Sequence, residues 1–276
     1  MRLESAAPWL VFVAAFLLFA VWESARPRRR LLVDERRRWR GHAVILAIGA
    51  TPAALIFQRT APLVTAAAVA DSPFGLLSRS SLPFVAQWVL AVLLLDLVKY
   101  AMHRAHHSIP WLWRVHQVHH SDPDLDVSTA GRFHPFETLA MQGAQLAAIV
   151  VLAPPPSAVL FTLVLAAFHT VFAHANASLP AWIERSLRTV LVTPDMHGIH
   201  HSEETREQSR NFGDVFPWWD HVLRTYAPTP AKGQDGLIPG LRGFQDERSV
   251  GIMFMLTLPF RRPVHAGTTR PVTISS

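Results

Sequence analysis

Residues 103–120 read HRAHHSIPWLWRVHQVHH, and six of these eighteen residues are histidine. Side chains three and four residues apart share one face of a helix. The spacing therefore places His103 beside His107, and it places His116 beside a neighbouring HH pair. A second stretch of the same form, HGIHH, begins at His197. Imidazole is the commonest metal-ligating side chain, so this pattern predicts a multi-histidine metal centre.

Composition indicates a membrane protein without thiol chemistry. Half of the 276 residues are apolar, 17% are charged, and there is no cysteine. The missing thiols exclude disulfides, thiolate metal sites and iron–sulfur clusters. Basic residues outnumber acidic ones by 26 to 20, and only Lys99 and Lys232 are lysine. Because the arginines cluster beside an apolar segment, we expect them to meet anionic lipid headgroups and not nucleic acid.

Apolar segments at 8–22, 41–57 and 82–102 predict three membrane crossings. We expect the first to be an uncleaved anchor and not a signal peptide. Residues 26–40 carry eight arginines, which the positive-inside rule places in the cytoplasm. Residues 58–81 are either an outer connection or a half-inserted hairpin. Residues 136–153 and 157–173 are either two short spanning helices or a hairpin that dips into the bilayer. Both versions bring the two histidine clusters together on the cytoplasmic side.

The predicted fold is all-α: a polytopic membrane protein with a cytoplasmic helical cap that carries the metal site. We divide the chain into membrane helices with an arginine-rich loop (1–81), a histidine-motif core (82–226), and a C-terminal interfacial segment with a tail (227–276). An amphipathic helix is expected over 179–192, on the membrane surface. The apolar run 251–260 is too short to span a membrane and is expected to dock at the interface.

Nine histidines are candidate ligands, eight by spacing and His174 because it ends a membrane segment. They are His103, His107, His116, His119, His120, His174, His197, His200 and His201. One ion of four to six ligands cannot use nine, which indicates two ions. All-nitrogen ligation suits iron, zinc, copper or nickel. No HExxH motif occurs, so the glutamate base of metalloproteases is missing.

Other polar residues are candidates for supporting roles. We expect Asp96, His134 and Asn176 in the second shell around the ligands. Asp96 would either hold the distal nitrogen of a ligating histidine or pair with Lys99 or Arg104. His134 would otherwise be a loop residue. His106 and His169 are weaker candidates for ligation, because neither lies on the helical face of the neighbouring ligands.

Four motifs, HRAHH, PWLWRVHQVHHSDPDLDVSTAGRFHP, FAHAN and TPDMHGIHHS, resemble those of the fatty acid hydroxylase or sterol desaturase superfamily. The resemblance covers roughly residues 96–226. It implies that the nine histidines bind a non-haem di-metal centre, normally two iron ions, with zinc possible in purified material. One position departs from the pattern: some members carry a histidine where this chain has Thr170. Either His169 substitutes there, or the coordination shell is one ligand short.

The resemblance implies O2-dependent hydroxylation or desaturation of a lipid, either an acyl chain or a sterol-like molecule. Electrons would come from a separate donor, and the enzyme would be integral to a bacterial-type inner membrane. Two alternatives from other classes stay open. One is a membrane hydrolase that uses zinc-activated water. The other is a non-enzymatic metal-binding or transport protein, although transport sites normally lie near the bilayer midplane.

Overall fold

A computed structural model describes residues 3–57 and 61–261 of the chain. Throughout these residues the regular structure is helical, apart from two isolated β-bridges. The principal helices are α1 (Leu3–Ala25), α2 (Glu35–Phe57), α3 (Pro62–Val69), α4 (Phe84–Ser108), α5 (Pro110–His120), α6 (Pro135–Leu152), α7 (Pro156–His174), α8 (Ala181–Leu187), α9 (Pro194–His200), α10 (Thr205–Gln208), α11 (Trp218–Val222) and α12 (Ile252–Thr257). The predicted all-α class is therefore confirmed.

Five of the described helices are long and apolar enough to cross a membrane: α1, α2, α4, α6 and α7. The three predicted crossings correspond to the first three of these. The sequence left open whether residues 136–173 form two spanning helices or a hairpin that dips into the bilayer. They form two separate helices of 18 and 19 residues. Ala153 ends α6 in the left-handed conformation, with φ 45°, and the following prolines cannot continue a helix. This arrangement favours two short spanning helices over a shallow hairpin.

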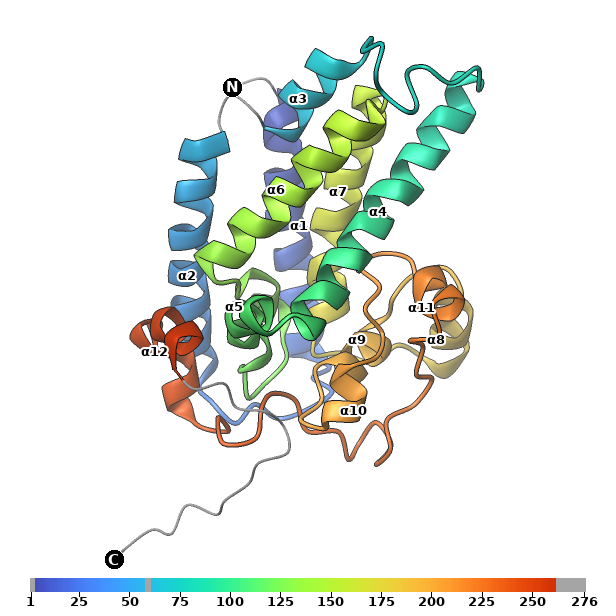
Figure 1. The fold of residues 1–276 in the computed structure, drawn as a ribbon. Helices are drawn as coiled ribbons and strands as arrows, with labels where there is room; N and C mark the ends of the chain where they lie inside the picture. The colour runs from blue at the N-terminus through green and yellow to red at the C-terminus, as the bar shows by residue number, and fades with distance from the viewer. Residues whose placement is uncertain (1–2, 58–60, 262–276) are drawn as a thin grey trace, which may run out of the picture.

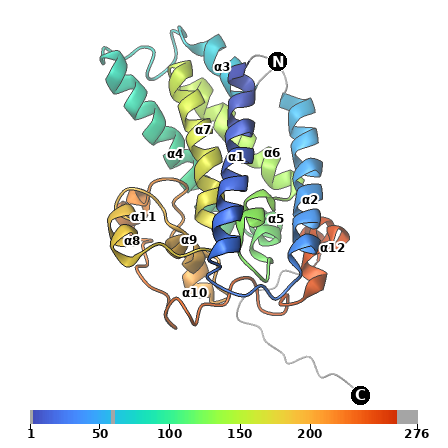
Figure 2. The same cartoon turned by 180° about the vertical axis from the view of Figure 1, so that it is seen from behind.

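The long helices form one upright bundle, and the histidine-bearing elements α5 and α9 lie at its lower end in Figures 1 and 2. The short helix α3 lies at the opposite end and packs against α6 and α7. Proline occupies the first turn of α5, α6, α7 and α9, where no intrahelical N–H bond is lost. In α5 and α9 this proline start lies at the lower end, directly before the histidines of each helix.

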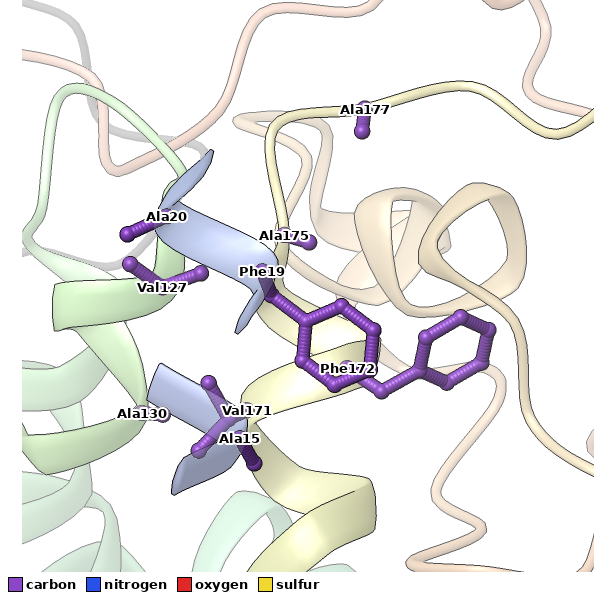
Figure 3. Packing of buried hydrophobic residues seen from close by; sticks show 9 residues of the cluster. All are labelled: Ala15, Phe19, Ala20, Val127, Ala130, Val171, Phe172, Ala175 and Ala177. Carbon is purple, nitrogen blue, oxygen red and sulfur yellow. The ribbon is translucent and has the colours of Figure 1, made fainter. Parts of the chain in front are cut away.

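Helices α1 and α7 pack closely just above that end (Figure 3). Phe19 of α1 meets Phe172 of α7 with ring centroids 5.4 Å apart, and Trp22 stacks on the same ring. Ala15 and Ala20 are buried in the same cluster, where small side chains let the helix backbones approach. The contact holds the C-terminal end of α7, and with it His174, against the rest of the molecule.

The arginines of residues 26–40 do not simply face lipid headgroups, as their clustering had suggested. Arg38 is fully buried in α2, donates to Asp122 at 2.8 Å and also bonds Asp126. Arg28 pairs with Asp195 at the start of α9. Several of these cations therefore hold the connections around the histidines in place, because the carboxylates that follow α5 and begin α9 lie within their reach.

Two predicted surface segments differ from expectation. The helix expected over 179–192 covers only Ala181–Leu187, and the chain continues as turns. The run 251–260, expected to dock at the interface, packs into the protein core. Its residues Met255 and Leu258 are buried against Ile45 of α2 and Val118 of α5, so it covers the side of α2 and α5.

Candidate metal centre

Four helix ends supply the nine histidines that the sequence singled out. The last turns of α4 supply His103 and His107, and α7 ends at His174. The remaining six come from α5 and from α9 with its C-terminal residue, namely His116, His119, His120, His197, His200 and His201. The HxxHH spacing works as predicted, because both copies lie on short helices whose faces point inward at the same place.

The structure brings these side chains into two groups, each of which could hold a metal ion. One comprises His103, His107, His116, His120 and His200; the other comprises His119, His174, His197 and His201. Within each group the candidate ligand atoms all lie within 4.8 Å of one another. The groups adjoin, since the rings of His120 and His201 stack with centroids 4.5 Å apart.

Hydrogen bonding alone does not account for the four-histidine group. His174 Nδ1 donates to the Thr170 carbonyl at 2.7 Å, so in the neutral ring Nε2 carries a lone pair. That atom lies 3.0 Å from His197 Nε2, which is itself 3.1 Å from His201 Nε2. The single proton of His197 cannot make a well-directed bond to both neighbours. Imidazole ligands ~2.0–2.1 Å from one ion would lie about 3.0–3.4 Å apart, which matches these separations.

The five-histidine group has free nitrogens that point inward. His103 Nδ1 lies 2.9 Å from the Phe212 carbonyl, and His200 Nδ1 lies 2.9 Å from the Arg210 carbonyl. His116 Nδ1 lies 2.6 Å from Glu137 Oε1. The Nε2 atoms of these three rings are buried without a hydrogen-bond partner. A metal-ligating histidine usually donates its other ring nitrogen to a carbonyl or carboxylate, so these residues fit a bound ion.

Burial also keeps the histidines of α5 and α9 in the form that binds metal. It is the main reason why the pKa values of His119, His120, His197 and His201 lie well below 6.5, and neighbouring imidazoles lower them further. Only a neutral imidazole has the lone pair that ligates a metal. An all-nitrogen donor set of this kind suits iron, zinc, copper or nickel and does not suit calcium or magnesium.

Glu137, which sequence reasoning missed, is the carboxylate beside the ligands. It lies in the first turn of α6 and is buried against His116. In the sequence it appears only as the end of RFHPFE, and no local spacing connects it with a histidine 21 residues away.

The three residues predicted for the second shell bond elsewhere. Asp96 accepts hydrogen bonds from Trp219 Nε1 at 2.9 Å and from the Val215 backbone, while Lys99 pairs with Asp214. Asp96 therefore holds the loop that precedes α11. His134 caps the start of α6 by accepting from the Phe136 N–H.

Asn176 also has a role apart from the ligands. Its side chain makes two bonds to the backbone of Arg29 and so fastens the connection between α1 and α2.

The two weaker candidates lie outside both groups. His169 Nε2 lies 2.8 Å from the Val192 carbonyl, within reach of the loop before α9. His169 therefore does not take the ligand position that Thr170 leaves open. His106 Nδ1 lies 2.7 Å from the Met102 carbonyl, and its ring adjoins that of His116. Its Nε2 atom is buried without a partner and borders the cavity described next.

A cavity of about 400 Å³ runs from the histidines into the helix bundle. Its lining is mainly apolar and comes from α1, α2, α4, α6 and α7, with Phe12, Leu95 and Leu163 among the contributors. His103, His116 and His119 border it at the metal-binding end. The space therefore suits an elongated apolar molecule with one part held against the imidazoles.

Comparison with known proteins agrees with this geometry. The sequence profile of the family described as Fatty acid hydroxylase matches residues 88–225, which include all nine histidines. Ornithine lipid hydroxylase OlsE of Rhizobium tropici is 28% identical over 180 residues, covering 65% of this chain and 52% of that protein. Alkylglycerol monooxygenase of Homo sapiens is 27% identical over 57% of this chain and 34% of its own length. Cholesterol 25-hydroxylase of Mus musculus is 26% identical over 51% of this chain and 47% of its own length.

The chain thus spans about half or less of the length of these relatives. No solved structure gives a significant match.

Proposed function

The chain belongs to the fatty acid hydroxylase family, and from this premise we propose that it is a membrane oxidoreductase that hydroxylates a lipid. The observation that carries the proposal is that an apolar cavity inside the helix bundle borders both histidine groups, through His103 and His116 of one group and His119 of the other. A cavity formed by helices of membrane-spanning length can receive an apolar chain from the bilayer. The relatives are described as hydroxylases and a monooxygenase, which favours hydroxylation over desaturation.

We propose that the two histidine groups each hold one iron ion. When bound, iron supplies the reactivity toward O2 that no protein side chain possesses. The protein positions the substrate. His103, His116 and His119 border the cavity, so a lipid chain bound there lies against them. The apolar wall keeps water from the reacting carbon. The reducing electrons would come from a separate donor, and zinc would be an alternative occupant in purified material.

The histidine end is proposed to face the cytoplasm. The arginine-rich segment lies at this end, since Arg29 bonds Asn176 just after α7 and Arg28 bonds Asp195 of α9. Short connections that are rich in arginine remain on the cytoplasmic side of a bacterial inner membrane.

The proposal is tested by profiling lipids from cells that contain or lack the protein, together with metal analysis of the purified protein. We expect a lipid that gains one oxygen atom, and a product that requires O2 and a reductant. His119→Ala and His200→Ala each remove a ligand from one group, so metal content and product should fall together while the protein still inserts. His221→Ala is the matched control, because His221 is exposed and stacks on Tyr226 away from both groups.

Two results would contradict the proposal. One is an unchanged lipid profile with a fully metal-loaded protein. The other is a product formed by hydrolysis without O2, which would favour zinc-activated water instead.

A further inference from the structure

Three polar side chains form a stripe on the cavity face of α6, a helix that is otherwise largely apolar. Thr138, Gln142 and Gln145 follow one another at helical spacing and all border the cavity. Met141, between them, borders it too. Because α6 is long and apolar enough to span a membrane, this face turns hydrogen-bonding groups toward a space at bilayer depth.

The two glutamine amides have no hydrogen-bond partner among the described residues, and both side chains are half-buried. Thr138, by contrast, bonds back to the His134 carbonyl at 3.4 Å. Glutamines in membrane-spanning helices normally bond across to a neighbouring helix. Leaving a polar group without a hydrogen bond in an apolar environment costs free energy. We therefore expect a molecule bound in the cavity to form hydrogen bonds with the two amides.

The distance of the stripe from the metal centre follows from helix geometry. Glu137 of the same helix contacts His116 and so marks the level of the ligands. Gln142 and Gln145 are five and eight residues further along, which corresponds to about 8 and 12 Å of helix rise. A glutamine amide offers a neutral donor and a neutral acceptor and does not offset a formal charge.

We propose that Gln142 and Gln145 bind an uncharged polar group of the substrate, a hydroxyl, ether, ester or amide, about 8–12 Å from the carbon that is oxidised. This inference rests on the proposed lipid hydroxylation and narrows its substrate class. The favoured substrate is a lipid that carries such a group at that separation, and a plain hydrocarbon chain is disfavoured. Gln142 and Gln145 then determine specificity and position, without touching the reacting atoms.

The experiment measures binding, so that its result does not depend on turnover. The full-length protein in detergent is titrated with radiolabelled hexadecanol and with hexadecane of the same chain length. Variants are Gln142→Leu, Gln145→Leu and the double variant. Met141→Leu is the matched control, since it changes the same wall of the cavity without removing a hydrogen-bonding group. Helix content and thermal unfolding verify that each variant is folded.

We expect the alcohol to bind about tenfold more tightly than the alkane in the parent protein, a ratio that corresponds to one or two neutral hydrogen bonds. The ratio should approach one in the double variant, take intermediate values in the single variants, and stay unchanged in Met141→Leu. Equal binding of the two probes by the parent protein would overturn the inference. A tenfold preference that survives in the double variant would overturn it too. Such a result would mean that the two amides of the parent protein bind water and not the alcohol. Either result leaves lipid hydroxylation to be decided by its own test.

Discussion

At the scale of single residues, Glu137 matters because of the histidine it orients. Its carboxylate lies 2.6 Å from His116 Nδ1, which leaves Nε2 of that ring directed into the five-histidine group. The carboxylate thus fixes both the tautomer and the ring orientation of a proposed ligand.

Replacing Glu137 should therefore weaken metal binding without removing a proposed ligand. Loss of such an outer partner typically lowers metal affinity 10–100-fold. We expect Glu137→Ala to approach the upper figure, since both the bond and the charge are lost. Glu137→Gln should lose less, because its amide oxygen can still accept from Nδ1. Equilibrium metal titration measures the effect, and Glu247→Gln, at an exposed ion pair with Arg37, is the control. Unchanged affinity in both Glu137 variants would refute the orienting role.

At the scale of elements, the sequence predicted those features of the site that depend on the spacing of residues within one helix. HxxxH and HxxHH fix which imidazoles share a helix face, and the nine predicted candidates do converge on one place. The predicted roles of Asp96 and the arginines failed for the opposite reason. Asp96 meets Trp219, 123 residues away, and Arg38 meets Asp122, 84 residues away. No periodicity of the chain encodes partners at such separations.

The buried cation Arg38 connects helix α2 to the elements that carry the histidines. Arg38 bonds Asp122 and Asp126, which lie in the connection between α5 and the 3-10 turn Val127–Gly131. Burial alone would raise the pKa of Asp122, but the charge of Arg38 holds it below its ordinary value.

Arg38→Met should consequently leave buried carboxylates uncompensated. Breaking a buried ion pair from one side costs about 3–5 kcal/mol. We expect a loss of stability of this size, seen as an earlier midpoint in chemical or thermal unfolding. Arg40→Met provides the comparison, because Arg40 lies two residues later in α2, is exposed, and donates to the Arg36 carbonyl. A variant at Arg38 as stable as the one at Arg40 would show that the pair contributes little.

At the scale of the whole molecule, so many buried neutral histidines make folding depend on pH. The histidines of α5 and α9 have pKa values below the ordinary 6.5, mainly because they are buried. As pH falls below 6.5, the unfolded chain binds protons at these residues before the folded protein does. Stability must then decrease, by up to ~1.4 kcal/mol per pH unit for each such histidine.

We therefore expect the metal-free protein to melt at progressively lower temperature between pH 7.5 and 5.5. The metal-loaded protein should melt higher throughout, because the ion binds only the folded arrangement of neutral imidazoles. Thermal unfolding at several pH values, with and without chelator, measures both effects. A melting temperature of the metal-free protein that does not change over this range would contradict burial of these histidines in the neutral form.

The proposed activity requires both the cavity and the metal centre. One substitution can obstruct the cavity and leave the metal centre unchanged. Ala167 of α7 borders the cavity but belongs to neither histidine group. A phenylalanine there would occupy space that an apolar substrate needs, while the ligands stay in place. We expect Ala167→Phe to lower formation of the oxygenated lipid at least about tenfold, since excluding part of a bound chain readily costs the 1.4 kcal/mol that this ratio represents.

Metal content of this variant should match that of the parent protein, unlike that of His119→Ala or His200→Ala. Val150→Phe adds a ring to the exposed face of α6 and serves as the control for bulk within a membrane helix. Product is measured by mass spectrometry of whole-cell lipids, and metal by elemental analysis of the same preparations. Full product formation by Ala167→Phe would mean that the substrate reaches the histidines by another route. Loss of metal together with product would mean that the cavity wall supports the centre itself, because α7 also ends in His174.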